Sequence, residues 1–349
     1  MLRAGRLAKA QKSAQIPACA RLRHDFSGRG NLDAKLEPQI ADQPQIDDPL
    51  HLHILLRFSG RSRHDPPDAL PTPAAGAVSL LRSIAALPAD TRRRTRMTVL
   101  LNGGAAQRRV RQWFVRALAP LELRAADVEA VASGNKPSFE AQLRALAAAH
   151  RGALHGTARD DPLVFFVEED YLFASSAIGA MVQFFEAYDP CMATPYDPPE
   201  QYFPASGANR IKFGSEYSHN VVLMGPSGRP WRSSTVTAVT YAARLSFLVH
   251  LTTRWTPPPW PRGVAAPPKA GNRSSFVRAA WRALPNPVND FAISRAISRE
   301  FGVWAPLPGL ATHVHLDLAP DVRSPAFPFD AVYNETRAGA RRLAALLAV

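Results

Sequence analysis

Apolar residues follow two alternating patterns between residues 51 and 187. Short apolar runs of strand length predict buried β-strands at His51–Phe58, Met97–Leu101, Val128–Ser133 and Leu163–Val167. Segments with apolar positions at helical spacing follow these runs and predict helices at Ala77–Leu87, at Arg108–Leu118, from the turn at 134–138 through Ala149, and at Ser175–Ala187. Strands that alternate with helices are typical of a mostly parallel sheet with helices on both faces, so we expect an α/β fold.

The pattern changes on either side of this region. Residues 1–48 are polar and lack steady periodicity, which predicts a disordered or loosely attached basic leader. Residues 49–195 contain the predicted strand–helix units, and residues 196–349 are the second half of the same domain. That second half is rich in proline, and it has few long periodic segments besides Thr237–Val249 and Asp290–Phe301. We therefore expect an irregular, Pro-rich lobe fused to the sheet.

Polar residues stand at the ends of the predicted strands. Arg57 lies at the end of the first strand, Asn102 follows the second, and Asn135 follows the third. The fourth strand leads directly into Glu168-Glu169-Asp170, called the acidic triplet below. In open α/β sheets, ligands bind outside the carboxyl ends of the strands. The sequence therefore predicts that these residues share one binding site.

The acidic triplet has the chemistry of a divalent metal site. Carboxylates are hard oxygen ligands that suit Mg²⁺ or Mn²⁺. A cation that bridges two phosphates needs few protein ligands, because diphosphate oxygens and water fill its other positions. The alternative is an acidic turn where a strand emerges into solvent. Three neighbouring carboxylates repel one another, which favours a cation or strong hydrogen bonds if they converge.

The net charge of +13 is unevenly distributed along the chain. Residues 1–24 contain six basic residues and no acidic residue, and Arg92–Arg94 form a second basic run with Arg96. A solvated surface is the simpler interpretation of both, so nucleic acid is not the partner that we expect. A basic surface can also attract anionic membrane lipid or nucleotide phosphates.

The sequence predicts a cytoplasmic protein. No stretch reaches the roughly 18–20 uninterrupted apolar residues of a membrane span. The first residues lack the apolar core of a secretory signal, and Cys19 and Cys191 form no metal or redox motif. Peripheral contact with an anionic membrane remains compatible with this compartment.

The acidic triplet in its context resembles a known family. The segment Val164–Leu172 is similar to the hydrophobic strand and acidic motif of GT-A glycosyltransferases, and most similar to little-characterised bacterial and viral glycosyltransferase-like proteins. Further similar segments follow the family's order at Gly134-Asn135 with Ser138-Phe139, Tyr196–Tyr202, Trp231-Arg232 with Ser234-Thr235 and Thr237, and Pro308–His313 with Ala319-Pro320. The resemblance covers about residues 51–330. It implies a GT-A-like fold with a nucleotide-sugar-binding half at 49–195 and an acceptor-side half at 196–349.

The resemblance also implies roles for individual residues. Asp170 would bind Mn²⁺ or Mg²⁺ directly, and Glu168 or Glu169 would face the ribose or the water molecules on the metal. The loop with Asn135 and Ser138 would lie near the nucleotide, which makes these two residues, with Arg57 and Asn102, candidate donor-binding residues. His313 stands where many such enzymes bring a late histidine to the metal or diphosphate. The acceptor would be a hydroxyl group of a glycan, a lipid or a small molecule.

The sequence departs from the family's pattern at three places. Glu169 replaces the usual middle Asp, and its longer side chain would reposition the ribose contact. Pro198 stands where the relatives usually have His, and Phe329-Asp330 replaces their usual Asp-Trp. These departures bear on whether this chain has the same substrate and activity as those relatives.

An inverting transfer needs a general base, normally Asp or Glu, to accept the proton of the acceptor hydroxyl. Asp290 opens the predicted helix Asp290–Phe301 and is the first candidate; the alternative role is that of a helix N-cap. Asp197 is the second candidate, and it is otherwise a turn residue before Pro198. A retaining transfer requires no such base.

Three other functions remain open at the level of sequence. A non-catalytic relative would bind a nucleotide sugar or a glycan without transfer. A nucleic-acid-binding protein would use the basic surface, with an affinity that falls steeply with salt. A phosphoester hydrolase would use the same carboxylates.

Overall fold

The computed structural model describes most of the region after the first 51 residues. The described residues are 52–59, 72–102, 107–131, 135–150, 161–197, 222–234, 240–253, 297–298, 300–314 and 326–347. The expectations for residues 1–48 and for Asp290 fall outside these ranges.

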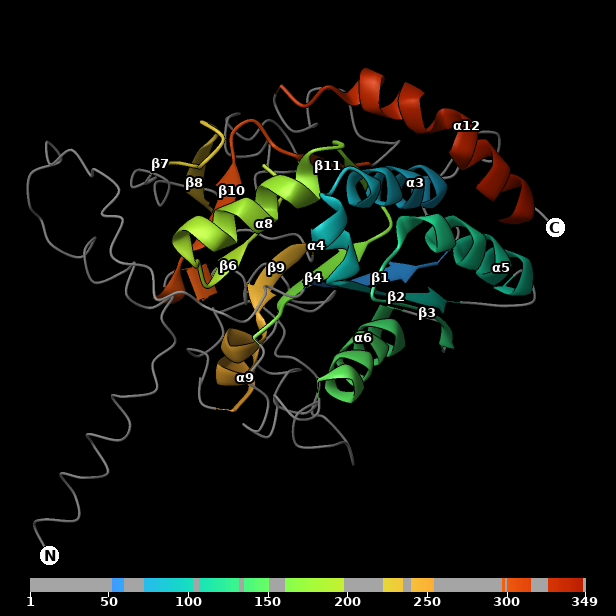
Figure 1. Ribbon diagram of the computed structural model, residues 1–349, viewed down its shortest axis with the longest axis horizontal. Helices are drawn as coiled ribbons and strands as arrows, with labels where there is room; N and C mark the ends of the chain where they lie inside the picture. The colour runs from blue at the N-terminus through green and yellow to red at the C-terminus, as the bar shows by residue number, and fades with distance from the viewer. Residues whose placement is uncertain are drawn as a thin grey trace, which may run out of the picture.

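Within these ranges, one sheet has nine strands in the order β3-β2-β1-β4-β9-β6-β10-β8-β7 (Figure 1). The first four are all parallel: β3 (Ala125–Val131), β2 (Thr95–Asn102), β1 (Leu52–Phe58) and β4 (Leu163–Glu168). Their helices are α3 (Thr72–Ala85), α4 (Ala89–Arg93), α5 (Gln107–Leu118), the 3-10 turn η2 (Ala119–Leu121), α6 (Asn135–Ala149) and α8 (Ala177–Tyr188). The predicted α/β fold with a parallel sheet is confirmed.

The strands that extend the sheet beyond β4 mix both directions. They are β9 (Tyr241–Arg244), β6 (Met192–Ala193), β10 (Val303–Pro306), β8 (Pro230–Ser234) and β7 (Val222–Met224). β9 runs antiparallel to both β4 and β6, β6 and β10 are parallel, and β8 runs antiparallel to β10 and β7. One continuous sheet therefore contains strands from both sides of residue 195.

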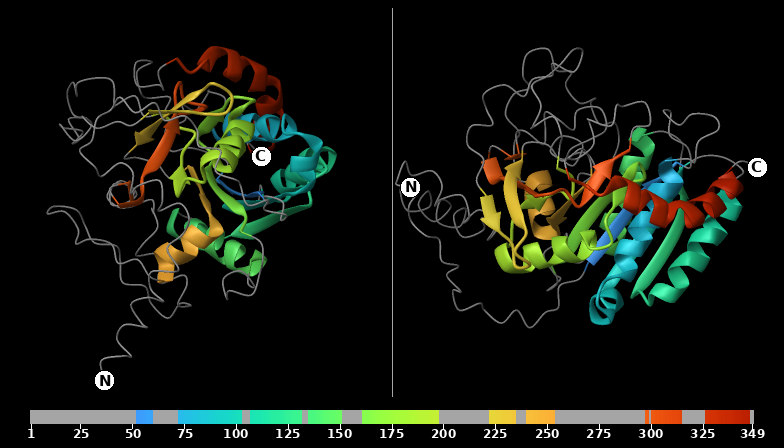
Figure 2. Two further views of the ribbon diagram at one scale, coloured as in Figure 1. Left: turned by 60° about the vertical axis from the view of Figure 1, so that its left-hand side comes forward. Right: turned by 90° about the horizontal axis from the view of Figure 1, so that it is seen from above.

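Alternate residues of the central strands divide the core into two layers. In β1, Ile54 and Leu56 belong to the layer that contains α3, α5 and α8, whereas Leu55 belongs to the layer that contains α6 and α9 (Leu245–Thr253). Phe165 and Phe166 of β4 are divided in the same way. Figures 1 and 2 show these helices on opposite faces of the sheet. This period of two, with both faces apolar, explains why the strands appear as continuous apolar runs.

The predicted elements of the first half lie where the sequence places them, with shifts of a few residues at their ends. The helix predicted at Ala77–Leu87 begins five residues earlier, at Thr72. The periodic segment Thr237–Val249 covers the strand β9 and the first part of the helix α9, which follows β9 directly. Of Asp290–Phe301, the described residues 297, 298, 300 and 301 are helical.

The last helix, α12 (Phe329–Leu347), packs on the outer side of α3 and also contacts α5 (Figure 2). Its Gly339 packs closely against Val78 of α3, and Glu335 forms an ion pair with Arg82 at 2.7 Å. The chain thus returns to the first half of the domain at its C-terminal end. Among the described helices, none is both long and apolar enough to cross a membrane.

Candidate metal and nucleotide-sugar site

The acidic triplet consists of the last residue of β4, Glu168, and the turn of Glu169 and Asp170 that leads into the short strand β5 (Tyr171–Phe173). β5 pairs antiparallel with β11 (Ala311–His313), so that His313 lies directly opposite Tyr171. The backbone N–H of Val314 donates a hydrogen bond to the carbonyl of Asp170 at 2.7 Å. This small second sheet brings a late segment of the chain to the end of the central strand β4.

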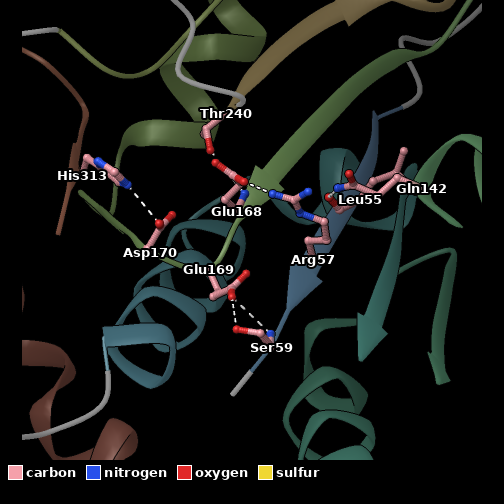
Figure 3. Close-up of polar contacts among 9 residues, drawn as sticks. All are labelled: Leu55, Arg57, Ser59, Gln142, Glu168, Glu169, Asp170, Thr240 and His313. Atoms are coloured by element: carbon pink, nitrogen blue, oxygen red, sulfur yellow. Dashed lines mark hydrogen bonds and ion pairs between the residues drawn. The ribbon is translucent and has the colours of Figure 1, made fainter. Parts of the chain in front are cut away.

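Asp170 and His313 are in direct contact (Figure 3). Oδ2 of Asp170 lies 2.9 Å from Nε2 of His313, and the side chains are 27% and 23% exposed. The imidazole stacks on the buried ring of Tyr171, with ring centroids 4.8 Å apart and an interplanar angle of 26°. The stacking fixes the plane of the imidazole, so Nε2 is directed at the carboxylate. The structure brings together the two residues that the sequence predicts as metal ligands.

Glu168 is held by the neighbouring strand. Arg57 and Glu168 are cross-strand neighbours in the parallel pair β1–β4, and they form an ion pair. Arg57 is almost completely buried, and this burial lowers its pKa, while the negative charges of Glu169 and Asp170 oppose that shift. A buried guanidinium beside three carboxylates offsets their mutual repulsion. The backbone N–H of Glu168 also donates to the hydroxyl of Thr240 at 3.2 Å.

Glu169 points away from Glu168, towards the end of β1. Its carboxylate accepts hydrogen bonds from the backbone N–H of Ser59, at 3.2 Å, and from the Ser59 hydroxyl (Figure 3). Loss of surrounding water raises the pKa of Glu169, the charge of Asp170 raises it further, and Arg57 and Ser59 oppose the increase. The three consecutive carboxylates therefore point to three different partners.

Helix α3 supports the turn through a row of small residues. A Cβ atom added to Gly76 would lie 1.9 Å from the carbonyl oxygen of Glu169, so the turn rests directly on the helix backbone. One turn later, the hydroxyl of Ser79 accepts a hydrogen bond from the N–H of Phe173 at 3.0 Å. The hydroxyl of Ser83 accepts one from the N–H of Ile178 at 2.9 Å. These contacts fix the position of the acidic triplet relative to α3.

The other predicted donor-binding residues lie at the same edge of the sheet. Asn102 is the half-buried last residue of β2, next to β1, and Asn135 is the first residue of α6, which follows β3. Ser138 lies in the first turn of α6; the side chains of Asn135 and Ser138 fall outside the description. The edge placement expected for Arg57, Asn102 and Asn135 is therefore observed, whereas their contacts with a donor stay a prediction.

The structure describes only one of the two candidate bases. Asp290 lies outside the described residues. Asp197 is buried, with 1% exposure, and forms an ion pair with Arg232 of β8, which is also buried. A Cβ on Gly309 would come within 3.1 Å of the Asp197 Cβ, so this carboxylate lies in a tightly packed junction. The contact gives Asp197 a structural role, and its catalytic role stays a prediction.

Sequence reasoning missed four residues that shape the site: Ser59, Gly76, Thr240 and Arg232. Ser59 directly follows β1, so the rule that located Arg57 and Asn102 applies to it equally. Gly76 lies inside a helical pattern, where a conformationally costly glycine often has a packing reason. Thr240 and Arg232 reach the site only through pairings between distant strands. Arg232 lies in one of the segments that resemble the family, but that resemblance did not assign it a role or a partner.

Comparison with known proteins gives low similarity throughout. No family model and no curated protein matches the chain. Among the solved structures that match is S. aureus TarS, at 12% identity and a TM-score of 0.36, covering 73% of this chain and 35% of that one. TarS 1-349 matches at 11% and 0.33, covering 67% and 55%, and its complex with UDP-GlcNAc at 10% and 0.36, covering 73% and 56%.

This chain thus spans between about a third and just over half of the length of these TarS structures. At TM-scores this low, we take neither fold nor function from the likeness. The proposed function therefore rests on the residues of the site itself.

Proposed function

We propose that this chain is a metal-dependent glycosyltransferase, which moves a sugar from a nucleotide-diphosphate donor to a hydroxyl acceptor. The observation that supports the proposal is the contact of Asp170 with His313 at the carboxyl end of β4, with 2.9 Å between Oδ2 and Nε2. The segment around Asp170 also resembles the acidic motif of GT-A glycosyltransferases. The sheet order and the helices on both faces are compatible with a GT-A-like fold.

Asp170 and His313 are suitable protein ligands for Mn²⁺ or Mg²⁺. Two adjacent ligands of an octahedral Mg²⁺ ion, each about 2.0–2.1 Å from it, lie about 3 Å apart. The observed 2.9 Å is also a hydrogen-bond distance, so a cation would take the place of the proton between Nε2 and Oδ2 without moving the two side chains far. Mg²⁺ prefers oxygen ligands, so the imidazole favours Mn²⁺ of the two. When bound, the cation would neutralise the negative charge that develops on the departing nucleoside diphosphate.

The donor itself would complete such a site. In the part of the chain that the structure describes, no group of three or more His, Cys, Asp or Glu side chains has the spacing of a metal site. Two protein ligands are sufficient where diphosphate oxygens and water supply the remainder. Affinity for the cation alone should therefore be weak, and cation and donor should bind together.

The neighbouring residues prepare the site for this donor. Tyr171 holds the His313 ring, and Arg57 holds Glu168 at the edge where a ribose hydroxyl would approach. Ser59 draws Glu169 away from Asp170, which leaves Asp170 as the carboxylate directed towards His313.

The proposed nucleotide contacts are Asn102, Asn135 and Ser138. Because Asp197 is buried with Arg232, Asp290 is our first choice for the general base.

Thermal unfolding with UDP-, GDP-, CMP- and dTDP-sugars, each with Mn²⁺ or with EDTA, tests the donor site. A donor at 100 times its dissociation constant should add about 2.7 kcal/mol to the free energy of unfolding. We expect this increase only with the metal, and we expect Asp170→Asn to abolish it without changing the stability of the free protein greatly. Asp90→Asn, which alters an exposed carboxylate in α4, is the matched control.

Turnover separates a transferase from a binding protein. With the donor identified, release of nucleoside diphosphate in the presence of hydroxyl acceptors should fall by about 10²- to 10³-fold in Asp170→Asn. Full activity in that variant would overturn the metal role. Metal-dependent binding without any release would instead identify a nucleotide-sugar or glycan-binding relative.

A further inference from the structure

The outer side of helix α5 is strongly basic. Its sequence, QRRVRQWFVRAL, contains no acidic residue, and its exposed side chains include Arg108, Arg109, Arg111 and Arg116. The buried side of the helix, with Phe114, packs on the sheet. The arginines therefore serve neither the core nor the acidic triplet, and no role in the proposed reaction accounts for them.

Helix α12 extends this basic surface. It contacts α5 and α3 on the same outer side of the sheet, and Figures 1 and 2 show α12 and α5 as neighbouring outer helices. Arg337, Arg341 and Arg342 are exposed on α12. Of its two acidic residues, Glu335 is paired with Arg82, and Asp330 lies in the first turn, seven residues before Arg337. We call the exposed arginines of α5 and α12 the α5–α12 face.

An apolar side chain stands within these arginines. Val115 is 53% exposed and lies between Arg111 and Arg116 on α5. Within the described residues, only two other large hydrophobic side chains are exposed, and both are on the edge strand β7, away from α5. Trp113, on the same helix, is half-buried. Because the apolar side of α5 packs on the sheet, the helix presents its arginines and Val115 outward, and arginines are attracted to the headgroups of an anionic leaflet.

We propose that the α5–α12 face binds the surface of an anionic lipid bilayer. Anionic headgroups match the charge of the arginines, and the acyl boundary accepts Val115, which a nucleic-acid backbone would leave in contact with phosphate. Helix α12 also contacts both α3 and β5, the two elements that adjoin the acidic triplet. The binding itself does not depend on the proposed transferase activity.

Sedimentation with vesicles tests the proposal on the full chain, without donor or metal. We expect binding to vesicles of phosphatidylcholine and phosphatidylglycerol, and little binding to phosphatidylcholine alone. Each arginine near an anionic surface contributes about 1 kcal/mol, so Arg111→Gln with Arg116→Gln should lower the partition coefficient roughly 20- to 30-fold. Binding should also weaken as NaCl rises from about 0.05 to about 0.5 M, because the salt screens the charges.

A single change on the opposite face of the sheet is the control. Arg144→Glu replaces an exposed arginine of α6 and alters the net charge by the same two units. It should retain most of the vesicle binding, and both variants should keep the far-UV circular dichroism of the unaltered protein. Equal losses in the two variants would show a response to net charge alone and would overturn the proposal. Equal binding to neutral vesicles, or tight binding to duplex DNA without vesicle binding, would also overturn it.

Discussion

At the scale of single residues, position in sequence does not decide what a carboxylate does. The acidic triplet Glu168–Asp170 is continuous, yet its members contact Arg57, Ser59 and His313 in turn. Arg57 and Ser59 come from β1 and its end, whereas His313 comes from the distant strand β11. The same logic applies to Asp197, whose buried partner Arg232 lies on β8.

The buried pair predicts a large stability effect for Asp197→Ala. Removal of one partner leaves an uncompensated buried charge, which typically costs about 3–5 kcal/mol. We therefore expect a decrease of roughly this size in the free energy of unfolding, measured by urea denaturation without donor. Asp90→Ala removes the partner of Arg93 in an exposed pair and should cost less than about 1 kcal/mol. An Asp197→Ala protein that is inactive but fully stable would favour the catalytic role over the structural one.

His53 predicts a dependence of stability on pH. It is buried in β1, where its ring nitrogens lie 2.9 Å from Nε2 of His150 and 3.0 Å from the hydroxyl of Thr98. Burial is the main cause that lowers its pKa from 6.5 to about 3, and the charges of His150 and Arg96 add to it. Its contribution to stability is therefore present above pH 6.5 and is lost as the pH falls, because only the unfolded chain accepts the proton.

The measurement is urea unfolding at pH values of about 7, 6 and 5. The free energy of unfolding should fall with a component of up to about 1.4 kcal/mol per pH unit that His53→Gln lacks. Titrating groups away from His53 cancel in the difference between the two proteins, whereas its direct partner His150 contributes to that difference. Parallel pH profiles would contradict the prediction, since they would mean that His53 titrates alike in both states.

At the scale of elements, α3 and the turn after β4 form one unit. The small residues Gly76, Ser79 and Ser83 allow the turn to approach the helix and then bind the backbone that follows it. Helix propensity alone would favour alanine over glycine by about 1 kcal/mol. The contact with the Glu169 carbonyl should outweigh this gain.

Gly76→Ala should therefore destabilise the protein by about 1–3 kcal/mol, the usual cost of overpacking, and should displace the acidic triplet. Urea denaturation gives the stability, and the Mn²⁺-dependent thermal shift with the identified donor reports the displacement. Gly179→Ala in α8 is the matched control, because its Cβ would meet only Leu87 Cδ2 at 3.8 Å. That control should be more stable than the unaltered protein by about 0.5–1 kcal/mol. The same sign for both variants would contradict the role of Gly76.

At the scale of the whole molecule, the sheet ties the two halves of the sequence together. β9 pairs with β4, β6 lies between β9 and β10, and α12 packs back on α3. If the two halves were separated, each would expose an edge of the sheet that the other half covers in the intact domain. We therefore expect the two halves to unfold as one cooperative unit.

Amide hydrogen exchange tests this expectation. Slowly exchanging amides of β1 in the first half and of β10 in the second should give the same free energy of opening, equal to that of global unfolding. A lower value across the whole of β10, with β1 unchanged, would show that the second half opens separately.

The sequence by itself determined the strands β1 to β4 and the helices α3, α5, α6 and α8 of the first half, but not the short elements α4, η2, β5 and β6. Apolar runs such as Leu163–Val167 are buried on both faces, and this requirement is visible locally, without knowledge of the partners. Ligands bind outside the carboxyl ends of parallel strands, and this rule then placed Arg57, Asn102 and the acidic triplet in one predicted site. The resemblance of the motif added His313, which no local pattern connects with Asp170.

Only the tertiary structure decided which groups meet. The pairing of β5 with β11 brings His313 to Asp170, and the pairing of β8 with β10 helps to bring Arg232 to Asp197. Such contacts join residues far apart in the chain, and their free energy depends on burial that the whole fold creates. Local periodicity records which side of a strand is apolar, but it carries no information about which distant strand will lie beside it.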